Sequence, residues 1–169
     1  MLKKTIGKVA FCMIVAFQLM GCASMQKQSQ SDVLNQNDLI SQLNKIINTA
    51  KENEVNNYAP KGFLKADALL KQSIELAQTG KNEKAFSTSK QGLTIINQAQ
   101  KDAKNVKKEL WELREYRTRA VKAGAPELYK EDFESSEKMF REIASYIEIG
   151  EVEKAKQNQP KLIEKYSNP

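Results

Sequence analysis

The sequence predicts an all-α fold of elongated antiparallel helical hairpins, with about five helices and one long central helix. From residue 37 onward apolar residues recur at spacings of three and four, without sustained alternation of apolar and polar residues. Single Gly and Pro residues divide this stretch into segments. Hydrophobic residues make up 40% of the chain but aromatic residues only 7%. The core is therefore expected to be thin and aliphatic, which suits long helices with a large surface.

Residues 1–21 have the order of charged and apolar residues that is typical of a secretory signal peptide. Lys3, Lys4 and Lys8 precede an apolar run over 9–17. That run is shorter than the roughly 20 apolar residues that a membrane-spanning helix needs. We therefore expect residues 1–21 to be cleaved and to take no part in the fold.

The apolar run is followed by Leu19-Met-Gly-Cys22, in which small and apolar residues precede a cysteine. This motif resembles the lipobox of bacterial lipoproteins. The resemblance implies transfer of a diacylglyceryl group to the Cys22 thiol, cleavage before Cys22, and acylation of the new amine by a fatty acid such as palmitate. Cys22 is then the lipidation site. An ordinary signal peptide followed by a chance cysteine is the alternative.

Lipidation changes the expected charge and place of the protein. The whole chain has 27 basic and 21 acidic residues, a net charge of +6, and three of the basic residues lie in 1–21. The mature chain keeps 24 basic and 21 acidic residues, or +3. The residue after the cysteine, residue 23, is Ala and not Asp. By resemblance to the sorting of enterobacterial lipoproteins, this favours the periplasmic face of the outer membrane over the inner membrane. Polar residues after Cys22 predict a flexible tether over 22–36.

Gly and Pro residues set the limits of the expected helices. Proline suits the first turn of a helix, where its missing N–H costs nothing, and glycine commonly follows the last turn. Pro60 and Pro126 are therefore expected to start helices, and Gly80 and Gly150 to end them. The five predicted stretches are 37–55, 60–79, 81–122, 126–149 and 151–166, the last interrupted by Pro160.

The stretch 81–122 shows the apolar spacing of a coiled-coil seam. Its seam residues are Ile96, Ala99, Ala103, Val106, Leu110, Leu113 and Ala120. An unbroken helix of this length would reach about 60 Å at 1.5 Å per residue. Gly92 is the expected bend, because interior glycine destabilises a helix by about 1 kcal/mol relative to alanine. Arg117 occupies a seam position and is expected to mark the end of the core.

The pattern Gly-x-x-Glu-Lys-Ala occurs at 80–85 and again at 150–155, 70 residues later. Each copy lies downstream of an Ala-Pro pair, at 59–60 and at 125–126, so the helix between pair and pattern is expected to be four residues longer in the second copy. The combination predicts an internal duplication. Residues 37–169 are then one helical array with two related halves, about 37–100 and 101–169.

Two families share features with these motifs. The segments 123–129 and 148–155 resemble the alanine-rich periplasmic helical domains of unknown function that occur on bacterial lipoproteins. This resemblance covers about 37–166 and implies a helical fold in the periplasm. The Gly-x-x-Glu-Lys-Ala turn is more weakly similar to the middle of a tetratricopeptide repeat, although the flanking helices are longer here and the spacing is not 34 residues. Neither resemblance implies a catalytic residue.

The sequence contains no histidine, which removes the commonest general base and the commonest neutral metal ligand. Four acids, Glu127, Glu131, Asp132 and Glu134, crowd the start of the fourth predicted helix, where they oppose the positive end of its dipole. They lack the spacing of an EF-hand, so helix-start electrostatics is preferred over a calcium or magnesium site. We expect no catalytic residue, no metal and no cofactor, and hence no enzyme.

Basic and aromatic residues mark the candidate binding surface. The segment 101–122 holds eight basic and four acidic residues, a net charge of +4. Such a segment suits lipid head groups, anionic glycans or an acidic partner, and an exposed Trp near arginines suits a peptide or a glycan. The candidate surface consists of Trp111, Arg114, Tyr116, Arg117 and Arg119. A solvated face paired within itself, by Glu115 with Arg119 and Lys108 with Glu112, is the alternative.

Together these features favour a lipid-anchored periplasmic helical scaffold or adaptor that binds another component of the cell envelope. A peptidoglycan- or glycan-binding protein, or an accessory or inhibitory module for a cell-wall enzyme, is the alternative. The expected partners are the membrane, through the lipid on Cys22, and an envelope protein, with peptidoglycan as the second choice. Nucleic acid is not expected in that compartment.

Overall fold

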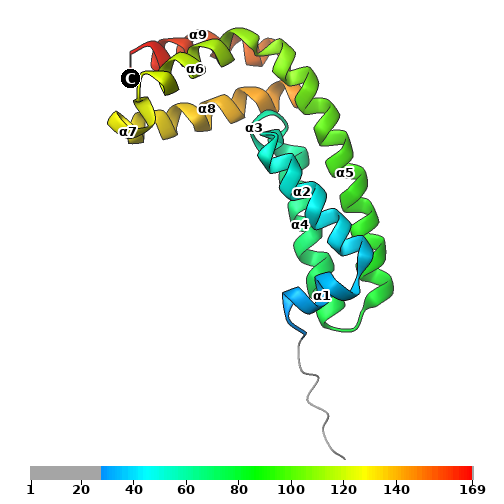
Figure 1. The fold of residues 1–169 in the computed structure, drawn as a ribbon. Helices are drawn as coiled ribbons and strands as arrows, with labels where there is room; N and C mark the ends of the chain where they lie inside the picture. Colours follow the sequence, from blue (N-terminus) through cyan, green and yellow to red (C-terminus); the bar gives the residue numbers. More distant parts are fainter. Residues whose placement is uncertain (1–27, 169) are drawn as a thin grey trace, which may run out of the picture.

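The computed structural model describes residues 28–168 (Figure 1). The expected signal peptide, the expected lipidation site Cys22 and the first part of the expected tether therefore lie outside the described residues. The described part contains nine helices: α1 (Gln30–Gln36), α2 (Asp38–Glu52), α3 (Val55–Tyr58), α4 (Pro60–Gln78), α5 (Asn82–Glu109), α6 (Trp111–Lys122), α7 (Ala125–Leu128), α8 (Lys130–Glu148) and α9 (Val152–Ser167).

All regular secondary structure of residues 28–168 is helical, so the expected all-α class is confirmed. The expected number of about five helices is wrong for this part of the chain. The short helices α1, α3 and α7 were not expected, and the expected central helix is divided into α5 and α6. None of the helices described has the length and apolar character needed to cross a bilayer.

The helices form two arms that meet at an angle (Figure 1). In the N-terminal half, α1 to α5, helices α2 and α4 pack along α5. In the C-terminal half, α6 to α9, helices α6 and α8 pack along α9. The chain passes from one half to the other at Leu110, between α5 and α6. Helix α8 also contacts α3, α4 and α5, so it forms much of the junction between the halves.

The two halves repeat the same backbone with an offset of 70 residues. Helices α3 and α7 have 4 residues each, α4 and α8 have 19 each, and the starts of α5 and α9 are separated by the same offset. Gly80 and Gly150 close equivalent turns with φ values of 73° and 83°. In both turns the residue after the glycine donates its N–H to the carbonyl four residues before the glycine, at 2.9 and 2.8 Å. Glycine is favoured at these positions because a side chain would be strained at positive φ.

The two Ala-Pro pairs are not equivalent, which corrects the expected difference in helix length. Pro60 opens α4, whereas Pro126 lies inside α7. With the offset of 70, the counterpart of Pro60 is Lys130 and the counterpart of Pro126 is Asn56. Helices α4 and α8 therefore have equal lengths. Residue 100 lies inside α5, so the backbone divides at Leu110 rather than near residue 100.

The predicted seam lies at the centre of the core. Each of its seven residues exposes 4% or less of its surface. Ala120 is among them and lies beyond Arg117 in the chain. The core therefore continues past Arg117, and the expectation that Arg117 marks its end is wrong.

Gly92 does not bend the helix, because α5 continues through it. A Cβ atom at Gly92 would lie 2.6 Å from Cδ2 of Leu43, a fully buried residue of α2. The missing side chain therefore allows α2 to approach α5 closely. The glycine serves packing between helices, and the bend lies at Leu110.

The bend at Leu110 contains no glycine or proline. Leu110 is 1% exposed and has φ −97° and ψ 24°. The last carbonyls of α5 lack partners within the helix. One of them, the carbonyl of Lys107, accepts a hydrogen bond from Nη1 of Arg114 at 3.4 Å. The chain therefore changes direction at a residue that is packed in the core, and the Arg114 side chain satisfies one of the carbonyls at the end of α5.

Part of the expected tether is helical. The Ser29 hydroxyl accepts from the Asp32 N–H at 3.2 Å, and the Asp32 carboxylate accepts from the Ser29 N–H at 3.3 Å. This capping box satisfies the first N–H groups of α1. Val33 is 2% exposed and anchors α1 against the neighbouring helices α2 and α4. The expectation of a flexible segment up to residue 36 is therefore wrong from Gln30 onward.

Pro160 does not interrupt the last helix, because α9 runs through it. Proline removes one N–H and frees the carbonyl four residues earlier, on Lys156. Both Pro160 and Lys156 are exposed, so water is available to the freed carbonyl. The helix is maintained by the buried residues Ala155 and Leu162 on its other side.

Candidate functional site

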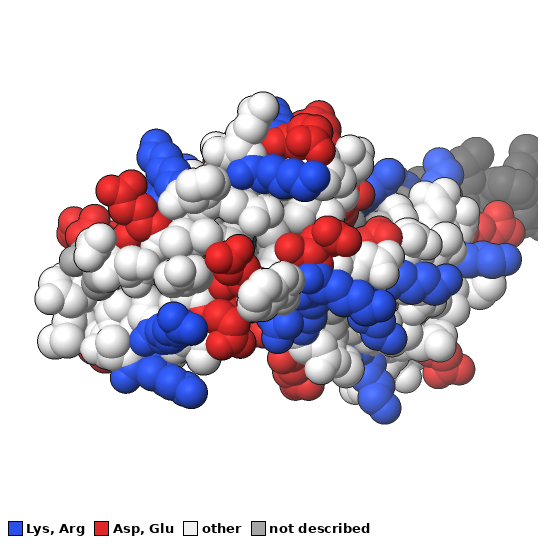
Figure 2. All heavy atoms as spheres, turned by 90° about the horizontal axis from the view of Figure 1, so that it is seen from above, with Lys and Arg blue, Asp and Glu red and all other residues white. Residues whose placement is uncertain are grey.

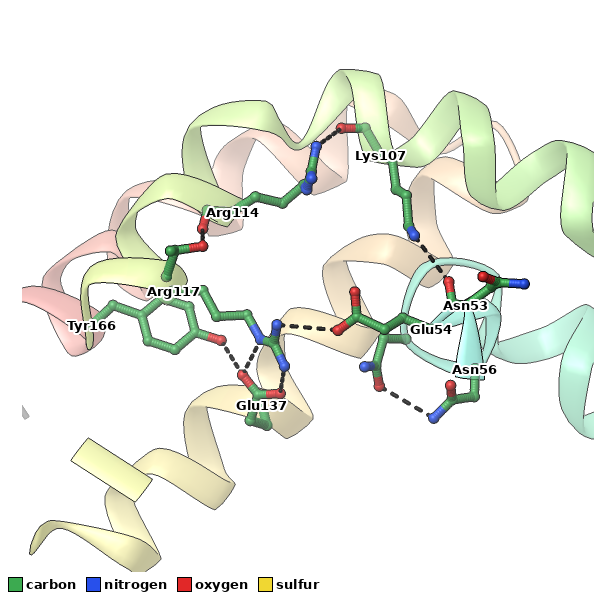
Figure 3. Close-up of polar contacts among 10 residues, drawn as sticks. Asn53, Glu54, Asn56, Lys107, Arg114, Arg117, Glu137 and Tyr166 are labelled. Carbon is green, nitrogen blue, oxygen red and sulfur yellow. Dashed lines mark hydrogen bonds and ion pairs between the residues drawn. The ribbon is translucent and has the colours of Figure 1, made fainter. Parts of the chain in front are cut away.

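A polar cluster lies where the two halves meet (Figure 3). Arg117 of α6 donates from Nε and Nη2 to the two carboxylate oxygens of Glu137 of α8, at 2.7 and 2.9 Å. Its Nη1 donates to Glu54, in the turn before α3, at 3.3 Å. Tyr166 of α9 donates its hydroxyl to the same Glu137 at 2.8 Å. Arg117 therefore connects the core of the C-terminal half with the N-terminal half.

The surroundings of this cluster raise the pKa values of Arg117 and Tyr166. The side chains of Arg117 and Glu137 are 23% and 14% exposed. The hydrogen bonds to Glu137 raise the pKa of Arg117, against the opposing effect of burial. Burial raises the pKa of Tyr166 far above its ordinary value, and the Glu137 carboxylate adds to the effect. Both groups keep their protons near neutral pH, so the cluster suits a structural connection better than proton transfer.

Tyr58 of α3 forms the apolar part of the junction. Its ring and the ring of Phe140 of α8 form a T-shaped pair, with 5.4 Å between centroids. Lys107 Nζ lies 4.7 Å from the Tyr58 centroid, and the guanidinium carbon of Arg114 lies 5.9 Å from it. Lys107 also donates to the carbonyl of Asn53 at 2.9 Å (Figure 3). These cation–π and hydrogen-bond contacts attach the end of α5 to the turn after α2.

Glu148, at the end of α8, caps a helix of the other half. Its carboxylate accepts from the N–H groups of Lys61 and Gly62, at 2.9 and 2.6 Å. These groups lie in the first turn of α4, whose own N-cap residue, Ala59, has no side chain that could accept them. A Cβ atom at Gly62 would lie 2.8 Å from Cβ of Ala99 and 3.1 Å from Glu148. Gly62 therefore leaves the space in which α4, α5 and α8 meet.

The five residues of the predicted binding surface do not lie on one face. Arg117 points into the junction, as described above. Tyr116 packs half-buried against the core, and Arg119 lies over its ring, 5.5 Å from the centroid. Trp111 is 63% exposed, and Arg114 is exposed three residues later on the same side of α6. Trp111, Arg114 and Arg119 are therefore the exposed members, and Arg114 also holds the Lys107 carbonyl and lies over the Tyr58 ring.

Trp111 and Arg114 continue a row of exposed lysines on α5, and we call the five residues Lys101, Lys104, Lys108, Trp111 and Arg114 the basic face. Within residues 28–168 none of its cations forms an ion pair with a carboxylate. The alternative of a self-paired face is therefore not what the described side chains show. Figure 2, which looks at the molecule from above the view of Figure 1, shows Lys and Arg side chains in the middle of the surface with Asp and Glu side chains beside them.

A cleft of about 430 Å³ opens between α2 and α5, next to the basic face. It is lined by hydrogen-bond donors over a small apolar floor, and the lining residues are Thr49, Asn53, Val55, Gln100, Ala103, Lys104 and Lys107. No carboxylate is among these residues. The cleft therefore offers two ammonium groups and two amides to an anionic group.

The acids at the start of the fourth predicted helix do not form a metal site in the described structure. Glu131 and Asp132 lie in the first turn of α8, where they oppose the positive end of its dipole, and Glu127 lies in α7. Among residues 28–168 no three Asp, Glu, Cys or His side chains are grouped closely enough to hold a metal ion.

Glu54, Tyr58 and Glu148 were not identified from the sequence. The partners of Glu54 and Glu148 lie 63 to 87 residues away along the chain. Spacing rules for neighbouring side chains cannot find such pairs. One signal was available, because Arg117 at a buried seam position requires carboxylate partners.

Comparison with protein-family models, with curated proteins and with solved structures gives no match for this chain. The resemblances to bacterial lipoproteins and to periplasmic helical domains therefore stay predictions.

Proposed function

We propose that the protein is a lipid-anchored periplasmic helical adaptor that binds another component of the cell envelope through the basic face. The basic face is the observation that supports this proposal. An exposed Trp among arginine and lysine side chains without acidic partners is typical of the centre of a binding surface. Such a surface recognises a partner by contact and charge.

The position of the basic face suits an adaptor. Gln78, at the end of α4, donates from Nε2 to the carbonyl of Gln28 at 2.8 Å, so the described chain begins near the turn between α4 and α5. The basic face lies at the other end of α5, which has 28 residues and a length of about 40 Å (Figure 1). A lipid on Cys22 would hold the first end at the membrane. The array of helical hairpins would then carry the basic face away from that membrane.

Removal of the lipid tests the anchoring step. We expect the Cys22→Ser variant to leave the outer-membrane fraction and to appear in the soluble periplasmic fraction, because no diacylglyceryl thioether can form. Membrane fractionation with carbonate extraction measures this. Continued recovery of the variant in the carbonate-resistant outer-membrane fraction would contradict lipid anchoring.

Substitution of the basic face tests the binding step. We expect Trp111→Ala with Arg114→Ala to reduce recovery of crosslinked envelope partners at least tenfold. The matched control is Phe86→Ala with Lys90→Ala, an exposed aromatic residue and a cation one turn apart near the other end of α5. Unchanged recovery with the first variant, or an equal loss with the control, would remove the basic face from the proposal.

The lysine-lined cleft favours a second candidate function, peptidoglycan binding. Lys104 and Lys107 could hold a carboxylate of a peptidoglycan stem peptide against the apolar floor of the cleft. Co-sedimentation with purified peptidoglycan separates the two candidates. Retention that is lost in Lys104→Glu would support wall binding, and no retention leaves an envelope protein as the partner.

A further inference from the structure

The N-terminal half exposes an aromatic side chain next to the turn between α4 and α5. Phe86 is 56% exposed, and within residues 28–109 the other exposed large apolar residue is Leu64. Asn82, Phe86 and Lys90 follow one another at intervals of four residues, so they share one side of α5, and we call these three exposed residues the tip face. Phe86 lies about 6 Å along the helix from Asn82. Its side chain tilts toward the start of α5, and hence toward the turn.

The described chain begins at the same end of this half. Gln78, the last residue of α4, donates to the carbonyl of Gln28 at 2.8 Å. Figure 1 shows α1 and the turn between α4 and α5 at the same end of the arm. Six steps of the chain join Gln28 to Cys22, the expected lipidation site, and an extended chain spans at most about 3.5 Å per step. A lipid on Cys22 would therefore keep Gln28 within about 20 Å of the membrane.

The equivalent place in the C-terminal half carries an ion pair instead of an aromatic ring. Lys156, the counterpart of Phe86, donates to the Glu153 carboxylate at 3.0 Å, and both side chains are exposed. Glu83 is the counterpart of Glu153, and within the described part of the chain it forms no ion pair. The same backbone thus presents paired charges to water in one half and an apolar ring in the half where the chain begins.

The charges at this end do not select an occupant. Exposed residues of both signs lie there, with Lys81, Lys84 and Lys90 against Asp32, Glu75 and Glu83. A single exposed ring commonly has no partner at all. The short connection to Cys22 provides one here, because it keeps the bilayer within reach of the tip face. Any contact must then come from the ring, with little help from charge.

We infer that Phe86 inserts into the interfacial region of the phospholipid bilayer to which the protein is anchored, so that the bilayer occupies the tip face. This inference rests on the proposed lipid anchor at Cys22. An aromatic ring suits the boundary between head groups and acyl chains, and the long side chain of Lys90 keeps its ammonium group among the head groups. The contact fixes one end of α5 at the membrane and holds the basic face, at the other end, away from it.

Fluorescence quenching in vesicles of phosphatidylethanolamine and phosphatidylglycerol tests this inference with the lipidated protein. A bimane label on Asn82→Cys reports contact with the bilayer, because phospholipids with a nitroxide near the head group quench it at short range. The same label on Asn105→Cys, exposed about 35 Å further along α5, is the reference. We expect at least threefold stronger quenching of the label at residue 82. High salt should change this ratio by less than 1.5-fold, since charge does not hold the contact.

Substitution of the ring separates insertion from tethering. Phe86→Ser in the Asn82→Cys protein should reduce the quenching at least twofold, because the lipid alone then holds this end. Leu64→Ser is the matched control, an exposed apolar residue near the start of α4, and should leave the quenching within 1.2-fold. The lipid still anchors both variants, so recovery of partners through the basic face should not change.

Mass spectrometry of Cys22 distinguishes a failed anchor from a failed insertion. In a protein that carries the lipid, equal quenching at residues 82 and 105, or no effect of Phe86→Ser, would overturn the inference and leave the anchor in place. Absence of the diacylglyceryl group would overturn the anchor and the inference together. Dimers in sedimentation velocity that Phe86→Ser dissociates would assign the tip face to a second copy and overturn the bilayer contact.

Discussion

Ile47 and Arg117 occupy equivalent positions in the two halves. The apolar residue has apolar surroundings, and the charged residue has polar surroundings. Ile47 is 4% exposed and belongs to the aliphatic core of the N-terminal half. Arg117 lies in a polar cluster inside the C-terminal half. The counterparts of the cluster members Arg117, Glu137 and Tyr166 are Ile47, Asp67 and Ile96. One backbone thus accommodates two kinds of interior.

The polar interior belongs to the C-terminal half, and its arginine, Arg117, also contacts the N-terminal half. Arg117 contacts Glu54 across the junction as well as Glu137 in its own half. A largely buried ion pair adds little net stability compared with apolar side chains of similar size, but loss of one partner is costly. We therefore attribute to this cluster the arrangement of the two halves more than their total stability.

The largest effect is expected when the N-terminal half receives the polar residue of the C-terminal half. Ile47→Arg buries a guanidinium that has no carboxylate arranged around it. We expect the free energy of unfolding to fall by about 4 kcal/mol or more. Urea denaturation followed by circular dichroism measures the change. Asn48→Arg, at the exposed neighbouring residue, should change it by no more than about 0.5 kcal/mol; a loss below 1 kcal/mol in Ile47→Arg would contradict a difference between the interiors.

The converse exchange should cost less and should be reversible by a second change. Arg117→Ile leaves the Glu137 carboxylate largely buried without its cation, and we expect a loss of about 3 kcal/mol. Glu137→Leu in the same chain removes that carboxylate and should restore most of the lost free energy. If the double variant is no more stable than Arg117→Ile, the cost arises from packing and not from the unpaired charge.

Removal of the Glu148 cap tests the connection between the halves directly. Glu148→Ala leaves two N–H groups at the start of α4 without their acceptor, and we expect a loss of about 2 kcal/mol. The sign of the change in the free energy of unfolding is informative. The Glu148 carboxylate lies at the C-terminus of α8, where it is repelled by the negative end of the helix dipole, so without the capping role its removal would stabilise α8. Gln78→Ala, at the counterpart position, should cost no more than about 1 kcal/mol. A more stable Glu148→Ala variant would contradict the capping role.

The sequence pattern was sufficient for the helical class, the buried seam and most of the helix ends. These follow from local chemistry: glycine at positive φ, proline in a first turn, and apolar spacing along one face. The bend at Leu110 could not be predicted, because Leu110 is an ordinary helix former and its place is set by packing against the rest of the core. The partners of Arg117 and the capping of α4 by Glu148 could not be predicted either, because they depend on how the two halves fold together.

The turns before α3 and α7 each contain a residue in the left-handed conformation, which is Glu54 in the first turn and Gly124 in the second. Gly124 has φ 82° and Glu54 has φ 59°. We expect Gly124→Ala to lower the free energy of unfolding by about 1 kcal/mol, because a side chain is strained there. Glu54→Gly should relieve a similar strain while losing the partly exposed contact with Arg117, so its net effect should lie within about 0.5 kcal/mol of zero. Thermal unfolding of the two variants measures the difference, and an equal loss in both would contradict the strain at Glu54.

Tyr166→Phe has an expected effect at neutral pH of the same size as Gly124→Ala, and it has the clearest dependence on pH. Tyr166→Phe removes one hydrogen bond to Glu137, which should cost about 1 kcal/mol at pH 7. The pKa of Tyr166 is raised in the folded protein by burial, whereas an unfolded tyrosine titrates near its ordinary value of about 10. Above that pH the unfolded chain loses a proton that the folded protein retains, so the free energy of unfolding falls as pH rises. Urea denaturation between pH 8 and pH 11 measures this dependence. The free energy of unfolding should decline less steeply with pH for Tyr166→Phe than for wild type, so the two curves should cross or converge at the alkaline end. Parallel curves would show that the junction does not hold the hydroxyl in its protonated form.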